Sequence, residues 1–155
     1  MTLIYEQIKT FRRMHMENFA KLFTGMSRTF QKKITIDDTA LNYGSGKIQD
    51  LFATPRLVAF MIEASAQLID TYLPDGYVSV SNSIEVDHYK STLVGSTVTV
   101  EVVIAGFENG KYQINMTAYD EFGQIGSGKH SRSVVNYRSL MLKAEQRTFE
   151  NHVAG

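Results

Sequence analysis

The sequence predicts an α+β domain in which a curved antiparallel β-sheet wraps around one long buried helix. Residues 57–73 place apolar side chains on every side of a helix, and a helix of that kind is a buried one. The chain after this helix is strand-like up to residue 137, interrupted only by short turns, and short turns make neighbouring strands antiparallel. The length of 155 residues fits one domain, so we treat residues 1–155 as a single domain.

The composition excludes several functions. The 16 basic and 16 acidic residues balance, so the chain has no overall field that would attract nucleic acid. There is no cysteine, which excludes a thiolate nucleophile, a disulfide and cysteine-bound zinc. The 4 histidines are scattered without metal-ligand spacing, and we therefore expect no bound metal.

The N-terminal segment is a predicted amphipathic helix. Apolar residues recur every three or four positions from residue 3 to residue 23, and the helix is expected to end near Gly25. Charged residues interrupt the segment, so it has neither the apolar core of a signal peptide nor the length of a membrane span. We expect no membrane association and a cytoplasmic location, and we treat residues 1–26 as a helical extension of the domain.

Strand-like runs precede and follow the apolar helix. Asn109-Gly110 is the strongest hairpin signal, and Gly95 and residues 121–123 mark two further turns. Residues 138–155 are a C-terminal tail in which residues 138–152 are predicted to form a polar helix. The five strands are predicted at residues 28–36, 76–88, 97–107, 111–119 and 124–137.

Thr54 and Pro55 indicate where the apolar helix begins. Thr54 suits the N-cap position and Pro55 the first helical position, where its missing N–H costs nothing. This structural role is sufficient for Thr54, so spacing alone does not predict a catalytic one. The first turn of a helix nevertheless offers free N–H groups that can bind a carbonyl oxygen as negative charge develops on it.

Glu63 is the only ionisable side chain between Arg56 and Asp70, in the middle of the apolar helix. A buried carboxylate is costly unless it finds donors or keeps its proton. One interpretation is a carboxylate that activates water or attacks a carbonyl. The other is a glutamate that reaches solvent or a subunit interface, or that completes a local hydrogen-bond network.

His88 ends a strand whose apolar residues share one parity, which should face the helix. Its side chain is expected on the helix side at the end of the strand, where a pocket opens. An inward histidine can also be purely structural. The residues of this parity are Val78, Val80, Asn82, Ile84, Val86 and His88.

Residues 126–132 place small residues and cations on or beside a strand. Lys129 and Arg132 are candidates to bind nucleotide phosphates, although an exposed pair of basic residues on a strand is an equally simple interpretation. The glycines are not a nucleotide-binding loop, because neither GxxxxGK[ST] nor GxGxxG opens a helix here.

Four segments together resemble the thioesterase family of fluoroacetyl-CoA thioesterase. In chain order they are NYGSG, FATPRLVAFMIEASA, VDHYKSTLVGSTVTVEV and GKHSRSVV, and the resemblance covers about residues 33–137. It implies the hot-dog fold, a homodimer with active sites between subunits, and a Thr, Glu and His set that cleaves acyl-CoA thioesters. Thr54 and His88 match that set. The family glutamate stands eight residues after the threonine, where this chain has Ile62 and Glu63 follows one position later.

The resemblance also implies a substrate and partners. Coenzyme A enters as part of the acyl-CoA substrate, with no separate cofactor; Lys129, His130 and Arg132 are candidates for its phosphate end, and Asn82 for a further substrate contact. One helix cannot cover both faces of a five-stranded sheet, so we expect a homodimer or a dimer of dimers. The alternatives are a hot-dog enoyl-CoA hydratase or dehydratase and a non-catalytic acyl-CoA-binding or regulatory protein.

Overall fold

The computed structural model of the chain describes residues 3–7, 9 and 21–153. Two short 3₁₀ turns, Ile36–Asp38 and Ala40–Asn42, stand between the first strand and the long helix. The helices and strands are β1 (Ser27–Lys33), α2 (Thr54–Asp70), β2 (Tyr77–His88), β3 (Thr97–Glu108), β4 (Lys111–Asp120), β5 (Gly123–Asn136) and α3 (Tyr137–Val153).

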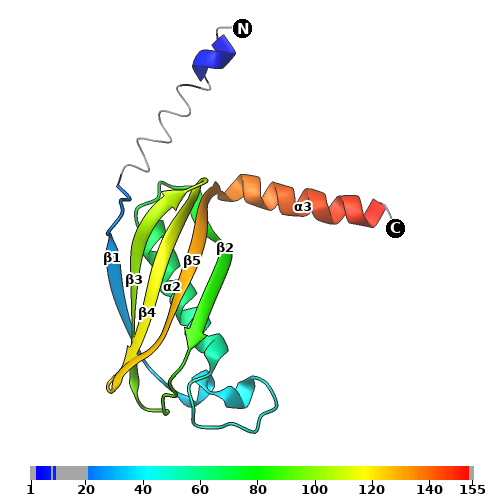
Figure 1. The fold of residues 1–155 in the computed structure, drawn as a ribbon. Coiled ribbons are helices and arrows are strands. Elements are labelled where there is room, and N and C mark those ends of the chain that lie inside the picture. Colours follow the sequence, from blue (N-terminus) through cyan, green and yellow to red (C-terminus); the bar gives the residue numbers. More distant parts are fainter. Residues whose placement is uncertain (1–2, 8, 10–20, 154–155) are drawn as a thin grey trace.

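The five strands form one antiparallel sheet in the order β1-β3-β4-β5-β2. The sheet is curved, and α2 runs along one of its faces (Figure 1). The predicted α+β architecture is therefore confirmed. The hairpin between β3 and β4 turns at Asn109 and Gly110, whose φ angles of 53° and 75° are both positive, as a two-residue turn of this kind requires.

The core lies between α2 and the inner face of the sheet. Alternate residues of β3 and β4 are buried, whereas only one side of α2 is. The prediction of a helix buried on every side is thus wrong for the single chain, because Ala59, Glu63 and Gln67 are exposed. The buried residues of α2 are Leu57, Phe60, Met61, Ala64, Ser65, Leu68 and Ile69.

Strand β2 changes parity half-way along. Its register with β5 shifts between Ser81 and Ser83, which is a β-bulge that inserts Asn82. Before the bulge the buried Ser79 faces α2, and after it Ile84, Val86 and His88 do. The predicted inward position of Val78, Val80 and Asn82 is therefore wrong, whereas that of His88 is correct.

Strand β1 begins and strand β5 ends at the same end of the sheet (Figure 1). Residues 3–7 and 9 are helical, and the remainder of the predicted N-terminal helix up to residue 20 lies outside the described residues. Leu22 is buried in the core, and the N–H of Gly25 donates to the carbonyl of Ile104 at 2.8 Å, which holds the start of β1 against β3. Among the described residues, no helix is long and apolar enough to cross a membrane.

The predicted C-terminal helix is present as α3. The N–H of Tyr137 donates to the carbonyl of Gly76 at 2.9 Å, and the N–H of Ser139 donates to Oδ1 of Asn136 at 3.0 Å, which caps the helix start. From there α3 projects past the edge strand β2, away from the sheet (Figure 1). None of its residues is buried.

Candidate active site at the start of helix α2

Thr54 is the first residue of α2, and its hydroxyl bonds to a histidine instead of capping the helix. The N-cap is Ala53, which corrects the predicted N-cap position of Thr54. Thr54 Oγ1 lies 2.8 Å from Nδ1 of His88, at the last residue of β2. The structure therefore brings together two side chains that are 34 residues apart in sequence and that were both predicted as site residues.

The His88 ring is held by Thr54 and Phe52, and its second nitrogen is not used by these contacts. Its edge packs against the ring of Phe52, with centroids 6.1 Å apart. Burial lowers the pKa of His88 below the ordinary histidine value, with a smaller opposing effect of the Lys90 backbone, so the ring is neutral near pH 7. Its Nε2 is buried and has no hydrogen-bond partner among residues 3–7, 9 and 21–153.

A small pocket opens beside this pair. Its volume is about 270 Å³, just below the range of about 300 to 1,000 Å³ that is typical of small-molecule sites. The walls come from the loop before α2 and from the residues that follow β2. Its lining residues are Ala40, Ile48, Leu51, Phe52, Ala53, Thr54, His88, Tyr89, Lys90 and Ser91.

The first turn of α2 presents one unused backbone donor. The N–H groups of Arg56 and Leu57 both donate to the carbonyl of Ala53, at 3.0 and 3.1 Å, and Pro55 has no N–H. In the described part of the chain this leaves the N–H of Thr54 without an acceptor. It lies at the positive end of the helix, where a developing oxyanion is stabilised.

Asp38 fixes this turn in place, and sequence reasoning did not identify it. Its Oδ1 accepts hydrogen bonds from Nε and Nη2 of Arg56, at 3.0 and 2.7 Å, and lies 2.8 Å from Nζ of Lys32. Its carbonyl accepts the N–H of Ala53 at 2.9 Å. Burial by itself raises the pKa of Asp38, but the hydrogen bonds from Lys32, Thr35 and Arg56 outweigh it and hold the pKa well below its ordinary value.

Comparison with known proteins decides the family. The model of the fluoroacetyl-CoA-specific thioesterase family matches residues 34–138, more than half of the chain. The chain belongs to the fluoroacetyl-CoA-specific thioesterase family. This confirms the predicted resemblance and makes the protein a thioesterase that acts on acyl-CoA thioesters.

Individual relatives agree with the family model. The fluoroacetyl-CoA thioesterase of Streptantibioticus cattleyicolor is 32% identical over 99 residues, which are 64% of this chain and 71% of the relative. A hot-dog-like protein from Thermanaerovibrio acidaminovorans is 26% identical, with a TM-score of 0.76 over 85% of this chain and 95% of that one. A mutant of the fluoroacetyl-CoA thioesterase, solved with acetyl-CoA, is 26% identical, with a TM-score of 0.76 over 82% and 99%. The hot-dog fold is thereby confirmed.

Within this thioesterase, Glu63 lies away from the Thr54–His88 pair. It is exposed, its Oε1 accepts a hydrogen bond from Nε2 of Gln67 at 3.4 Å, and it does not line the pocket. Because α2 is a regular helix from its first turn, nine residues at about 100° each place Glu63 on the opposite side of the helix from Thr54. Ile62, one residue earlier, lies about 80° from Thr54 around the helix. The catalytic role predicted for Glu63 has no support from its position in a single chain.

We therefore expect Glu63→Gln to have little effect. An exposed carboxylate with one long hydrogen bond contributes little to stability, so the free energy of unfolding should change by less than about 0.5 kcal/mol. The kcat per folded molecule should stay within about twofold of the parent value. Thermal unfolding and initial rates measure both. A fall of tenfold or more in kcat at unchanged stability would instead indicate that Glu63 takes part in catalysis.

His130 and Arg132 of the thioesterase form a second, buried polar cluster on the inner face of β5. They are 1% and 4% exposed. Nε and Nη2 of Arg132 donate to Oγ and the carbonyl of Ser79, at 2.9 and 2.7 Å, and Nη1 donates to Oγ of Ser81 at 3.0 Å. Ser81 Oγ lies 2.8 Å from Nε2 of His130. Because both side chains are buried, neither can reach a phosphate of coenzyme A in the single chain. The sequence analysis did not identify Ser79 and Ser81 as their partners.

The other predicted contacts lie on the outer face of the sheet. Lys129 is exposed and lines an open groove of about 440 Å³ with Glu85 and Asp87. Asn82, in the bulge, accepts a hydrogen bond from Oγ of Ser133 at 2.7 Å. In a single chain the sheet separates both side chains from the pocket at Thr54, so their roles in substrate binding stay predictions.

Stability should fall in mild acid because of His130. Burial, and secondarily the charge of Arg132, lowers the pKa of His130 to about 4. An unfolded histidine titrates near pH 6.5, so the unfolded chain takes up the proton first as the pH falls. The contribution of His130 is complete above about pH 6.5 and is lost progressively down to about pH 4, on the order of 3 kcal/mol in total.

Urea unfolding at pH 7.5 and pH 4.5 measures this loss. His130→Gln should have a smaller difference between the two values than the parent chain. His152→Gln, at an exposed position of α3, is the matched control and should keep the parent difference. An equal pH dependence in His130→Gln and the parent would show that the buried imidazole does not set it.

Proposed function

We propose that this thioesterase hydrolyses small or medium acyl-CoA thioesters at the Thr54–His88 pair, with no cofactor. The observation that carries the proposal is the 2.8 Å contact between Thr54 Oγ1 and His88 Nδ1 in two residues that line the pocket, while Nε2 of the same ring is buried and has no hydrogen-bond partner in the described part of the chain. A structure of a related thioesterase contains acetyl-CoA, which supports a substrate of this class.

In the proposed mechanism His88 is the general base. Its Nδ1–H donates to Oγ1 of Thr54, which orients the ring and leaves the lone pair of Nε2 to accept a proton from water. The hydroxide adds to the thioester carbonyl, and the N–H of Thr54 stabilises the resulting oxyanion. The C–S bond then breaks, the sulfur receives the proton from Nε2, and the products are the free acid and CoA.

A thioesterase assay on a panel of acyl-CoAs tests the proposal. Hydrolysis releases the CoA thiol, and because the chain has no cysteine, thiol reagents report CoA alone. Acetyl-CoA, fluoroacetyl-CoA and hexanoyl-CoA cover the short and medium range. A hydratase would consume an enoyl-CoA without releasing thiol, and a binding protein would do neither. Either of these results would overturn the proposed reaction.

We further propose that the protein is a homodimer joined through β2. Among the described residues no further strand pairs with either edge of the sheet, β1 or β2, but the two edges differ. The short edge strand β1 carries the cations Arg28, Lys32 and Lys33, which discourage pairing. The other edge strand, β2, has 12 residues and no lysine or arginine. Pairing two copies of β2 would satisfy its free backbone groups and join two sheets with their helices on the same side.

Sedimentation of the full chain at micromolar concentration is expected to give twice the mass of one chain, which is 17.5 kDa. Ile84→Pro in β2 should reduce the dimer fraction, because proline cannot donate a hydrogen bond to a neighbouring strand. Lys33→Pro, at an exposed position of the opposite edge strand β1, is the matched control. A species of 17.5 kDa alone would exclude the proposed dimer.

The cytoplasmic location follows from the same proposal, since an acyl-CoA hydrolase acts where CoA thioesters are present. Fractionation of cells that express the full chain tests it.

A further inference from the structure

Helix α3 extends beyond the region that the family model matches, and every residue of the helix from 141 to 153 is exposed in the described chain. The match ends at residue 138, the second residue of the helix. An isolated helix of 17 residues is marginal in water unless an apolar side is covered. Phe149 and Val153 are 70% and 71% exposed, and Met141 and Leu142 are exposed as well.

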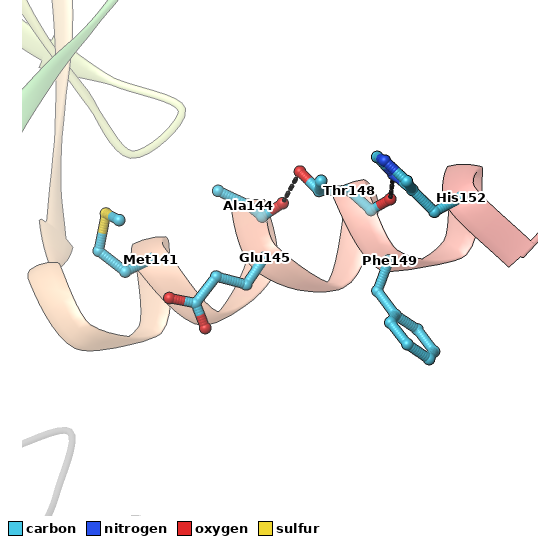
Figure 2. Close-up of a pocket in the computed structure, with 6 residues that line it drawn as sticks. All are labelled: Met141, Ala144, Glu145, Thr148, Phe149 and His152. Carbon is cyan, nitrogen blue, oxygen red and sulfur yellow. Dashed lines mark hydrogen bonds between the residues drawn. The ribbon is translucent and has the colours of Figure 1, made fainter.

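The exposed apolar residues of α3 include Met141, Leu142, Phe149 and Val153, and these four fall in a stripe within about 120° of the helix circumference, with the carboxylate of Glu145 among them. Figure 2 shows Met141 and Phe149 projecting from the helix. The polar residues of the last turns bond within the helix instead: Oγ1 of Thr148 lies 3.0 Å from the carbonyl of Ala144, and Nδ1 of His152 lies 3.0 Å from the carbonyl of Thr148. The stripe is therefore free to pack against another surface.

A second exposed apolar surface surrounds the Thr54–His88 pocket. Ile48 and Tyr89 line the pocket and are 55% and 49% exposed. The neighbouring Leu41 and Leu93 are exposed too. This surface lies at the His88 end of β2, whereas α3 starts beside Gly76 at the other end of the same strand.

A twofold axis through the middle of β2 brings these opposite ends together. In antiparallel pairing, the start of one β2 lies next to the end of the other. Helix α3 already projects past β2 toward the side where the partner sheet would continue (Figure 1). Its 17 residues extend about 25 Å, which equals about five strand spacings. The helix is thus long enough to cross to the partner's pocket.

We propose that α3 is an arm that closes the Thr54–His88 pocket of the partner subunit in the dimer. The stripe of Met141, Leu142, Phe149 and Val153 packs on the apolar surface formed by Leu41, Ile48, Tyr89 and Leu93 of a second copy. The pocket of a single chain, about 270 Å³, is small and open for an acyl-CoA, and the arm supplies a missing wall. The inference rests on the proposed dimer.

Cross-linking tests the arm in the full chain. Because the chain has no cysteine, introduced thiols are unique. The double variant Phe149→Cys with Ile48→Cys is expected to give a covalent dimer with a short thiol-reactive cross-linker, and each single variant is expected to give none. Arg147→Cys with Ile48→Cys is the control, because two residues of helix place Arg147 about 200° from Phe149.

Activity gives an independent measurement. Phe149→Asn is expected to raise KM for acetyl-CoA and hexanoyl-CoA, on the order of tenfold, with the dimer intact. Arg147→Asn should leave KM unchanged. If the protein sediments as a dimer but the double variant gives no covalent dimer, the proposed position of α3 is wrong while the dimer stands. Cross-linking of the single variant Phe149→Cys would also contradict that position, because it would indicate that two α3 helices pair with each other. A monomer would instead overturn the proposed dimer.

Discussion

His88→Ala is expected to lower kcat for acyl-CoA hydrolysis by about 10² or more, because the substitution removes the proposed general base. His88→Asn should lose as much, although its amide can still donate to Oγ1 of Thr54. The Thr54 hydroxyl has a smaller part, that of orienting the ring, so Thr54→Val should lose about tenfold and Thr54→Ser much less. Steady-state rates on acetyl-CoA, with sedimentation and thermal unfolding to confirm an intact fold, measure these effects.

The pH profile distinguishes a general base from a structural histidine. His88 must be neutral to accept a proton, so activity falls as the pH drops through its pKa. Because burial lowers that pKa, the acidic limb of kcat should lie below about 6.5. Residual activity in His88→Ala should lack this limb. An unchanged rate and profile in His88→Ala would assign His88 a structural role only.

The fold could be predicted because its signals are local. The turn at Asn109-Gly110, the alternation along β3 and β4 and the apolar run of α2 depend on residues that are close in sequence. The first strand was predicted to continue to residue 36 but ends at Lys33. Asp38 is the reason, since its ion pairs with Lys32 and Arg56 stabilise the turn that follows, and the contact with Arg56 spans 18 residues.

The inner and outer positions of β2 could be predicted only in part. Alternation is a reliable guide until a bulge interrupts it, and the bulge at Asn82 has no glycine or proline to reveal it. Before the bulge the residues that face inward are serines. Serine is unexpected in a core unless its hydroxyl has a buried hydrogen-bond partner. That partner is Arg132, 53 residues away, whose guanidinium needs both hydroxyls. Long-range polar pairing of this kind leaves no periodic signal.

The sequence predicted which residues form the candidate site better than it predicted how they are arranged. Thr54 and His88 were selected, and the structure places them in contact. Sequence reasoning gave Thr54 the wrong position in the helix start, because the exact residue at which a helix begins is the least certain part of such a prediction. Of the two interpretations left open for Glu63, its exposure in the single chain fits the glutamate that reaches solvent or a subunit interface.

The glycines of β5 allow the two strands that hold His88 and Arg132 to approach closely. A Cβ at position 128 would lie 2.5 Å from the carbonyl oxygen of Glu85 and 3.0 Å from Cε of Met116, so an alanine there forces backbone atoms apart. At Gly126, paired with His88, a Cβ would lie 2.8 Å from the carbonyl oxygen of Asp87. The glycine run therefore serves strand packing, in agreement with the absence of a nucleotide-binding motif in the sequence.

Gly128→Ala is consequently expected to destabilise the protein by about 3 kcal/mol, through forced separation of β2 from β5. Gly106→Ala in β3 is the matched control, because its Cβ would meet nothing within 4 Å, and it should cost far less. Gly126→Ala should also lower kcat per folded molecule, since the displaced backbone carries His88. Urea unfolding gives the stabilities and initial rates give kcat. If Gly128→Ala unfolds at the same urea concentration as Gly106→Ala, the close approach of β2 and β5 does not limit stability, and the sheet has room to relax there.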